Sequence, residues 1–238
     1  MRAVLFDLDD TLFDHRRSAR AALTGVHRAH GRDTAYDEFE RAHTRYLEEM
    51  HIEVLAGRIG LEEARRERFR RVFAALGVAL GDRDVELTAA AYRDGYKLAR
   101  RALAGAAELL EAVRRHARVA IVTNNLLEEQ QDKLQYCALA PLVDALIASE
   151  DVGVSKPDPG IFQIALDRVG ATADEAVMVG DSWANDVVGA TRAGIRAVWF
   201  NPDRKPVPAE PAGVAAIESL TPTPDVLRLL VGREHAHP

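Results

Sequence analysis

A pair of carboxylates, Asp7 and Asp9, stands directly after the first apolar segment of the chain, residues 3–6. A buried strand of a parallel sheet is a continuous apolar run, and charged groups at its end cost free energy of desolvation unless a metal, a cation or hydrogen bonds compensate them. Strand ends of this kind are where α/β proteins place their chemistry. Taken alone, the pair also fits an acidic turn that caps the next helix.

Three later apolar segments show the same order of strand followed by polar group. They are residues 119–122 before Thr123, residues 145–147 before a loop that carries Lys156, and residues 176–179 before Gly180-Asp181, with Asp186 five positions on. Each motif alone is a weak signal, but the four in this order are specific. We expect them to converge at one edge of a sheet.

Together these motifs resemble the haloacid dehalogenase-like (HAD) hydrolase superfamily, most of whose members are magnesium-dependent phosphohydrolases, and the resemblance covers almost the whole chain. It implies an α/β fold with a Rossmann-like parallel sheet, helices on both of its faces, and an inserted α-helical bundle cap domain. A finer similarity, to 5′-nucleotidase-like and acylneuraminate-phosphatase-like members, rests on residues 179–190 and on the run from Thr123 to Gln131. That run departs from the commoner Thr-Asn-Gly in having Asn125.

The resemblance also assigns roles to individual residues. Asp7 is implied as the nucleophile that forms an aspartyl-phosphate, and Asp9 as the general acid and later the general base. The phosphate group is implied to bind Thr123, Asn124 and Lys156, with Thr123 and Lys156 also catalytic. The implied ligands of Mg²⁺ are Asp7, the backbone carbonyl of Asp9, and Asp181. Asp186 is expected to support the site by holding Lys156 or a metal-bound water, near a helix N-terminus where a carboxylate is favourable.

Phosphoryl chemistry explains why these residue types are needed. A phosphate monoester carries about two negative charges near neutral pH, and an attacking carboxylate adds another, so positive charge must be present before any bond forms. Oxygen ligands from Asp7 and Asp181 suit Mg²⁺. Lys156 is one of only four lysines in a chain whose positive charge is otherwise arginine, which indicates that a compact point charge is required there.

Motif spacing predicts where the second domain lies. The interval between Thr11 and Thr123 is far longer than one strand-to-strand crossover needs. Residues 15–100 show helical periodicity in the stretches 18–30, 36–55, 61–76 and 85–98, without a convincing strand. We therefore predict a catalytic core of residues 1–14 and 101–238 and a helical cap domain of residues 15–100. Strands are also expected at 197–200 and 215–217, a helix at 225–231, and a mobile tail at 232–238 in which a metal role for His235 and His237 is the lesser interpretation.

Composition narrows the classes of partner. The chain has a formal net charge of −6 and a pI near 5.8, which argues against binding to a nucleic-acid backbone. The sequence has no long charge-free apolar run that would indicate a membrane span or a signal segment, so we expect a soluble, cytoplasmic protein. The resemblance implies a small phosphorylated metabolite as its substrate. The oligomeric state is not predicted.

Two other functions compete with a magnesium-dependent phosphatase. A dehalogenase of the same fold attacks carbon with its Asp and has no use for Asp9 or Asp181. A non-enzymatic phosphoacceptor module of receiver type also groups Asp, Thr and Lys at strand ends, but it is a short single domain whose phosphorylated Asp lies on a middle strand. Asp7 at the N-terminus, followed by a long helical insertion, disfavours that interpretation.

Overall fold

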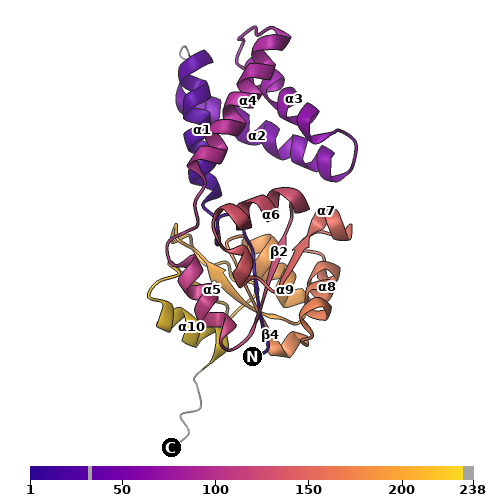
Figure 1. The fold of residues 1–238 in the computed structure, drawn as a ribbon, viewed down its shortest axis with the longest axis vertical. Helices are drawn as coiled ribbons and strands as arrows, with labels where there is room; N and C mark the ends of the chain where they lie inside the picture. Colours follow the sequence, from indigo (N-terminus) through magenta and orange to yellow (C-terminus); the bar gives the residue numbers. More distant parts are fainter. Residues whose placement is uncertain (32–33, 233–238) are drawn as a thin grey trace, which may run out of the picture. The chain divides into compact units, whose positions relative to one another are not determined.

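The computed structural model describes residues 1–31 and 34–232, and Figure 1 shows the arrangement of its elements. The predicted tail at 232–238, including His235 and His237, lies outside the described residues except for Gly232.

Within the described residues, the α/β part of the chain is built on a six-stranded parallel sheet, in the order β3-β2-β1-β4-β5-β6. Its strands are β1 (Ala3–Phe6), β2 (Arg118–Thr123), β3 (Ala145–Ala148), β4 (Ala176–Gly180), β5 (Arg196–Phe200) and β6 (Ala215–Ile217). Every residue of β1 and β4 is buried, as continuous apolar runs in a parallel sheet predict. The predicted α/β fold is confirmed.

Helices cover both faces of the sheet. On one face, α8 and the segment that contains α9 pack against alternate residues of the strands in a single apolar cluster, which includes Leu5, Val122, Phe162, Met178 and Ala190. Helix α5 contacts β2 and α10, and none of the buried residues of α5 and α10 belongs to that cluster, so these two helices lie on the other face (Figure 1). The helices of the core are α5 (Ala106–Arg114), α6 (Leu127–Tyr136), α7 (Ser149–Val152), α8 (Pro159–Val169), α9 (Gly189–Arg192) and α10 (Thr223–Val231). Short helices with other hydrogen-bond spacings are η1 (Ala140–Leu142), η2 (Ala173–Glu175) and the π-helix η3 (Trp183–Val188).

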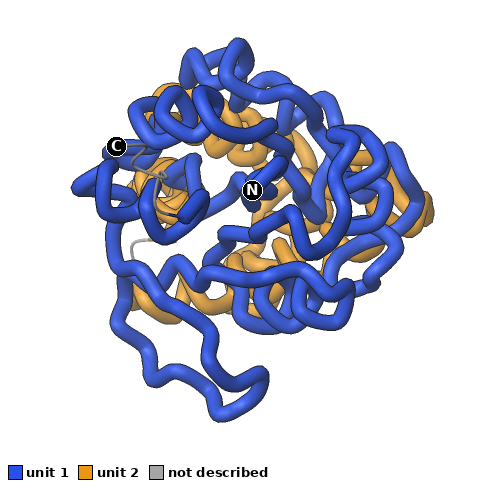
Figure 2. Tube along the Cα trace, turned by 90° about the horizontal axis from the view of Figure 1, so that it is seen from below, with its two compact units in different colours: residues 1–14, 101–238 blue, residues 15–100 orange. Residues whose placement is uncertain are grey.

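The chain divides into two compact units, drawn in different colours in Figure 2. Unit 1 is Met1–Asp14 with Arg101–Pro238, and unit 2 is His15–Arg100. Unit 2 is the helical insertion between β1 and β2 that forms the cap, with α1 (His15–His30), α2 (Tyr36–Leu55), α3 (Leu61–Ala75) and α4 (Asp82–Ala99). These helices share an apolar core that includes Leu23, Phe39, Phe69, Val72 and Tyr92.

The two places where the chain leaves and re-enters unit 1 are joined to each other. Phe13 and Ala102 form an antiparallel bridge, and the N–H of Leu103 donates to the carbonyl of Leu12 at 2.8 Å. The guanidinium of Arg101 donates to the carboxylate of Asp14 at 2.7 Å. These bonds join the two segments of unit 1 that flank the insertion in the sequence.

No helix in the described ranges is both long enough and apolar enough to cross a membrane.

The apolar cluster under α8 generates a stability prediction. Phe162 is fully buried, so Phe162→Ala should lower the free energy of unfolding by about 3–5 kcal/mol, because it removes apolar contact and leaves a cavity. Denaturant titration of both proteins measures the difference. Val207→Ala, at an exposed position, is the control and should change the free energy by less than about 0.5 kcal/mol. A loss of similar size in both variants would contradict the packing described here.

Candidate active site

The register of the sheet brings the predicted strand-end residues together. Phe6 of β1 is level with Ile121 of β2 and with Val179 of β4. Asp7 therefore lies one position beyond this level, and Thr123 and Asp181 lie two positions beyond it. Because β1 lies between β2 and β4, all three side chains come from adjacent strand ends at the point where the chain order of the sheet reverses.

The carboxylate of Asp7 is buried and held at both oxygens. Its Oδ1 accepts from Nζ of Lys156 at 2.8 Å, and its Oδ2 accepts from the hydroxyl of Thr11 at 3.0 Å. Burial, the largest cause, and the negative charge of Asp186 together raise the pKa of Asp7 to about 7, against the attraction of Lys156. Additional positive charge close to Asp7 would lower this pKa and favour the carboxylate.

Lys156 is buried, and three acceptors surround its ammonium group. Nζ donates to Oδ1 of Asp7 at 2.8 Å, to Oδ1 of Asp186 at 2.7 Å and to the carbonyl of Val122 at 2.7 Å. Burial disfavours the charged form, but the attraction of Asp186 and Asp7 outweighs it and raises the pKa of Lys156. The ammonium is thus a fixed positive charge, and all three of its hydrogens are directed at acceptors.

Asp186 is completely buried on η3, and the backbone at Gly180 leaves room for it. One oxygen pairs with Lys156, and the other accepts from the N–H of Ser182 at 2.9 Å. A Cβ added at Gly180 would lie 2.2 Å from Oδ2 of Asp186, so a larger residue at position 180 would displace the carboxylate. Asp186 thus contacts Lys156 directly, and its supporting role in the site stays a prediction.

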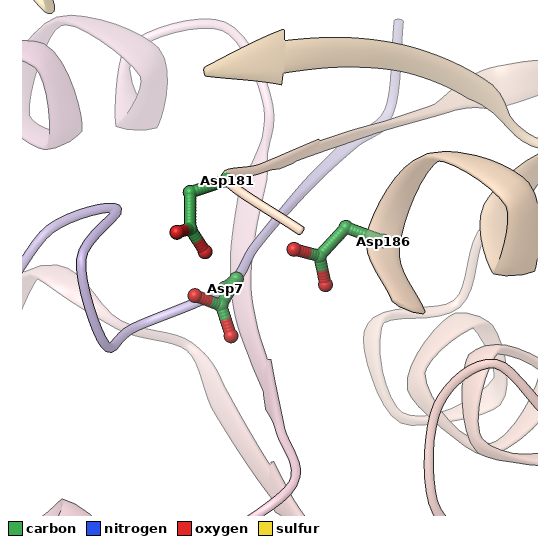
Figure 3. Close-up of side chains that lie close together, drawn as sticks. All are labelled: Asp7, Asp181 and Asp186. Carbon is green, nitrogen blue, oxygen red and sulfur yellow. The ribbon is translucent and has the colours of Figure 1, made fainter. Parts of the chain in front are cut away.

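Asp7, Asp181 and Asp186 form a cluster in which one carboxylate oxygen of each residue lies within 4.8 Å of those of the other two. Figure 3 shows the three side chains directed into the same space. Asp181 is also linked to β1, because its N–H donates to the hydroxyl of Thr11 at 3.1 Å. Three oxygen-bearing acids around one point, with a raised pKa on Asp7, are a donor set that fits a divalent cation such as Mg²⁺.

Thr123 and Asn124 lie at the end of β2 beside this cluster. Thr123 is buried, and the side chain of Asn124 clamps the backbone of Lys156. The amide of Asn124 donates to the carbonyl of Lys156 and accepts from its N–H, both at 2.7 Å. Asn124 therefore positions Lys156, and its predicted contact with substrate stays a prediction.

Asp9 lies apart from the acidic cluster, against helix α6. Its carboxylate accepts from Lys133 at 2.7 Å and 2.8 Å, from the amide of Asn125 at 3.1 Å and from the amide of Gln130 at 3.3 Å. The backbone turns directly after Asp9, where Asp10 has a positive φ of 62°. The sequence predicts that the backbone carbonyl of Asp9 binds the metal. The contacts of the Asp9 side chain do not test this role, which stays a prediction.

Three of these contacting residues have roles that were not predicted from the sequence, namely Thr11, Gln130 and Lys133. Thr11 follows the Asp-x-Asp pair as the last residue of the first motif. Lys133 could have been found by the same compositional argument as Lys156, because it is another of the chain's four lysines. Gln130 stands three positions before Lys133, the spacing that places both on one face of a helix.

Comparison with known families gives one match over most of the chain. Residues 1–194 match the family model described as haloacid dehalogenase-like hydrolase. The chain is 34% identical over 230 residues to a phosphoserine phosphatase of Thermus thermophilus, covering 87% of this chain and 91% of that protein. It is also 34% identical over 129 residues to the pyrimidine 5′-nucleotidase YjjG of Escherichia coli, a match that spans 54% of this chain and 56% of that protein.

Solved structures with the same fold include both magnesium-bound and dehalogenase examples. YfnB from Bacillus subtilis, in a structure bound to magnesium, superposes with a TM-score of 0.74 at 25% identity, covering 95% of this chain and 98% of that chain. A dehalogenase superposes with a TM-score of 0.76 at 24% identity over 98% of both chains, a likeness that concerns the fold alone.

The acidic cluster predicts a pH-dependent response to magnesium. In the metal-free chain the pKa of Asp7 rises from 3.8 to about 7, so its contribution to stability is present at low pH and lost as the pH rises through about 7. A cation must displace the proton of Asp7 to bind, and its affinity falls as the pH falls below that value. Magnesium should therefore raise the unfolding temperature more at about pH 8 than at about pH 6.

Thermal unfolding with and without Mg²⁺ measures this effect. Asp181→Asn should abolish the magnesium-induced shift, whereas Asp225→Asn, on the exposed side of α10, should retain it. Equal shifts at both pH values, or a full shift in Asp181→Asn, would show that the cation binds elsewhere.

Proposed function

Because the chain belongs to the haloacid dehalogenase-like hydrolase family, we propose that it is a magnesium-dependent phosphatase that cleaves a small phosphate monoester through an aspartyl-phosphate on Asp7. The matched region, residues 1–194, includes every residue that the proposal uses. The finer part of the proposal, phosphorus rather than carbon as the atom attacked, rests on the residues around Asp7.

The observation that carries the proposal is the arrangement of fixed charge at Asp7. Its carboxylate is held by Lys156 and Thr11, and Asp181 and Asp186 lie close by. A site that attacks a phosphate dianion must place positive charge next to a nucleophile that is itself an anion. Lys156 supplies one such charge, and the cluster of acids supplies the ligands for another.

In the proposed reaction, an oxygen of Asp7 attacks phosphorus and the bond from phosphorus to the ester oxygen breaks. Asp9 gives its proton to the departing oxygen, so the alcohol leaves uncharged. Water then attacks the phosphorus of the aspartyl-phosphate, Asp9 takes a proton from that water, and the carboxylate of Asp7 is restored. The products are the alcohol and inorganic phosphate.

Asp7 and Asp181, with the backbone carbonyl of Asp9, would hold Mg²⁺, which would neutralise charge on the phosphate and keep Asp7 ionised. Asp186 would act on the reaction through Lys156, whose ammonium it contacts at 2.7 Å. Two cationic groups would then flank the phosphate on the side of Asp7.

Thr123 and Lys156 are the proposed contacts of the phosphoryl oxygens, and Lys156 would exchange one of its three protein acceptors for a phosphoryl oxygen. The Thr123 hydroxyl lies at the end of β2, next to the strand that carries Asp7, and the N–H groups that follow Asp7 and Thr123 are further donors at these strand ends. Asn124 supports this arrangement by fixing the backbone of Lys156. The proposed substrate is a small phosphorylated metabolite, of which nucleoside monophosphates and sugar phosphates are the first candidates.

A dehalogenase is the alternative within the same fold. In that chemistry the aspartate attacks carbon and neither a metal nor a general acid is needed. This chain has residues for both the metal and the general acid. Asp181 belongs to the acidic cluster that could hold a metal, and three side chains contact the carboxylate of Asp9. These residues favour the phosphatase.

Replacement of the nucleophile tests the proposal. Asp7→Asn should lower the turnover of para-nitrophenyl phosphate by about a thousandfold or more, because the amide cannot form the acyl-phosphate. Phosphate release in the presence of Mg²⁺ measures the activity, and circular dichroism checks that the fold is kept. Asp225→Asn is the matched control and should keep full activity. An Asp7→Asn variant that retains more than about a tenth of the wild-type rate would refute the assignment.

A further inference from the structure

Helix α6 presents a set of donors to one carboxylate outside the acidic cluster. Lys133 contacts both oxygens of Asp9, and the amides of Gln130 and Asn125 contact its Oδ2. The side chain of Lys133 is only 6% exposed, and that of Asp9 is 22% exposed. This ion pair is therefore a largely buried contact rather than a surface salt bridge.

The surroundings of Lys133 hold its ammonium in place. Nζ lies 5.2 Å from the centre of the Phe13 ring, and Phe13 is fully buried in the turn that follows β1. That turn is itself bonded to Asp9 and Asp10, through a bridge between Asp9 and Phe13 and a 2.7 Å hydrogen bond from the N–H of Asp10 to the carbonyl of Phe13. The lysine thus ties α6 to the motif that carries both aspartates.

Two amide side chains also contact Asp9, that of Gln130 on α6 and that of Asn125 just before the start of α6. Gln130 is fully buried, and among the described residues its Oε1 has no hydrogen-bond partner. Burying that oxygen without a partner costs free energy, and the same amide donates from Nε2 to Asp9 at 3.3 Å. Asn125 accepts from the N–H of Leu126 at 2.9 Å, which links its contact with Asp9 to the beginning of α6.

Two neighbouring carboxylates are therefore bound by two different lysines. Lys156 binds Asp7, and Lys133 binds Asp9, although the two aspartates are only two positions apart in the chain. The contacts of Lys133 with both oxygens of Asp9 hold that side chain against α6, whereas Asp7 is held by Lys156. Separation of the two acids is a requirement of the mechanism, because they must do different work.

We propose that Lys133 is a positioning residue, which with Gln130 and Asn125 holds the side chain of Asp9 in the orientation that proton transfer requires. The contacts of Lys133 with both oxygens hold Asp9 as a carboxylate, the form that accepts the proton of the hydrolytic water, and the proton that Asp9 carries for the leaving oxygen takes the place of one of these two contacts. The inference rests on the proposed function. Proton transfer needs the two heavy atoms within hydrogen-bond reach, so a loosened Asp9 lowers the rate of the step rather than the affinity for substrate.

Esters that differ only in their leaving group report on this role. Para-nitrophenolate leaves readily without a proton, whereas phenolate, the conjugate base of an acid with a pKa of about 10, is a poorer leaving group and gains more from Asp9. Phenyl phosphate and para-nitrophenyl phosphate have nearly the same shape, so contacts with the rest of the protein are matched.

The test compares kcat and KM of Lys133→Met and wild type on both esters with Mg²⁺ present. We expect kcat to fall about tenfold or more on phenyl phosphate and less than about threefold on para-nitrophenyl phosphate, with KM unchanged on both. Lys133→Arg, which keeps a cation, should restore most of the lost rate. Lys205→Met, at an exposed lysine, should behave as wild type. If Lys133→Met does not fold, Gln130→Leu should change the two rates in the same direction.

A double-mutant cycle separates positioning from a general structural effect. On phenyl phosphate, where Lys133→Met alone should lower kcat about tenfold or more, this substitution should cause no further loss when Asp9 is already Asn, because both changes act on one step. Equal losses on both esters, additive losses in the cycle, or a higher KM with unchanged kcat would each overturn the inference. Absence of phosphate release from either ester by the wild-type enzyme would instead refute the proposed function, and this inference with it.

Discussion

The candidate site depends on one buried ammonium group. Nζ of Lys156 donates to Asp7, to Asp186 and to the carbonyl of Val122. In the part of the chain that the structure describes, it is the buried cation at hydrogen-bond distance from both acids. Removing one partner of a buried ion pair typically costs about 3–5 kcal/mol, because the other charge is left uncompensated. Three acids and one ammonium leave a negative excess, which a divalent cation would offset.

The fold supplies this arrangement through the sheet. Because β1 lies between β2 and β4, residues that are more than a hundred positions apart in the sequence lie at the same edge of the sheet. Lys156 lies in the loop after β3, where two hydrogen bonds with Asn124 hold its backbone. Gly180 then allows the carboxylate of Asp186 to lie against the end of β4. Each of these positions is fixed by backbone geometry, so the charges are in place before a substrate arrives, which is the preorganisation on which electrostatic catalysis depends.

The sequence was informative wherever a motif coincided with a strand end. Continuous apolar runs predicted the strands, and the polar residues after them predicted that Asp7, Thr123, Lys156 and Asp181 would meet. The partners of Asp9 were not predicted, because the direction of a side chain on α6 depends on how that helix packs against the sheet, which local periodicity does not encode. The double contact of Thr11, to Asp7 and to the backbone of Asp181, likewise joins segments that only the tertiary fold brings together.

The central claim is that Asp7, held by Lys156, attacks phosphorus. Rapid acid quenching of the enzyme during turnover of para-nitrophenyl phosphate, followed by mass spectrometry of its peptides, tests it most directly. The account predicts a phosphoryl group on Asp7 in the wild-type protein, more of it in Asp9→Asn, and none in Lys156→Met. A phosphoryl group on another residue, or turnover by the wild type with no modified peptide at any quench time, would contradict it.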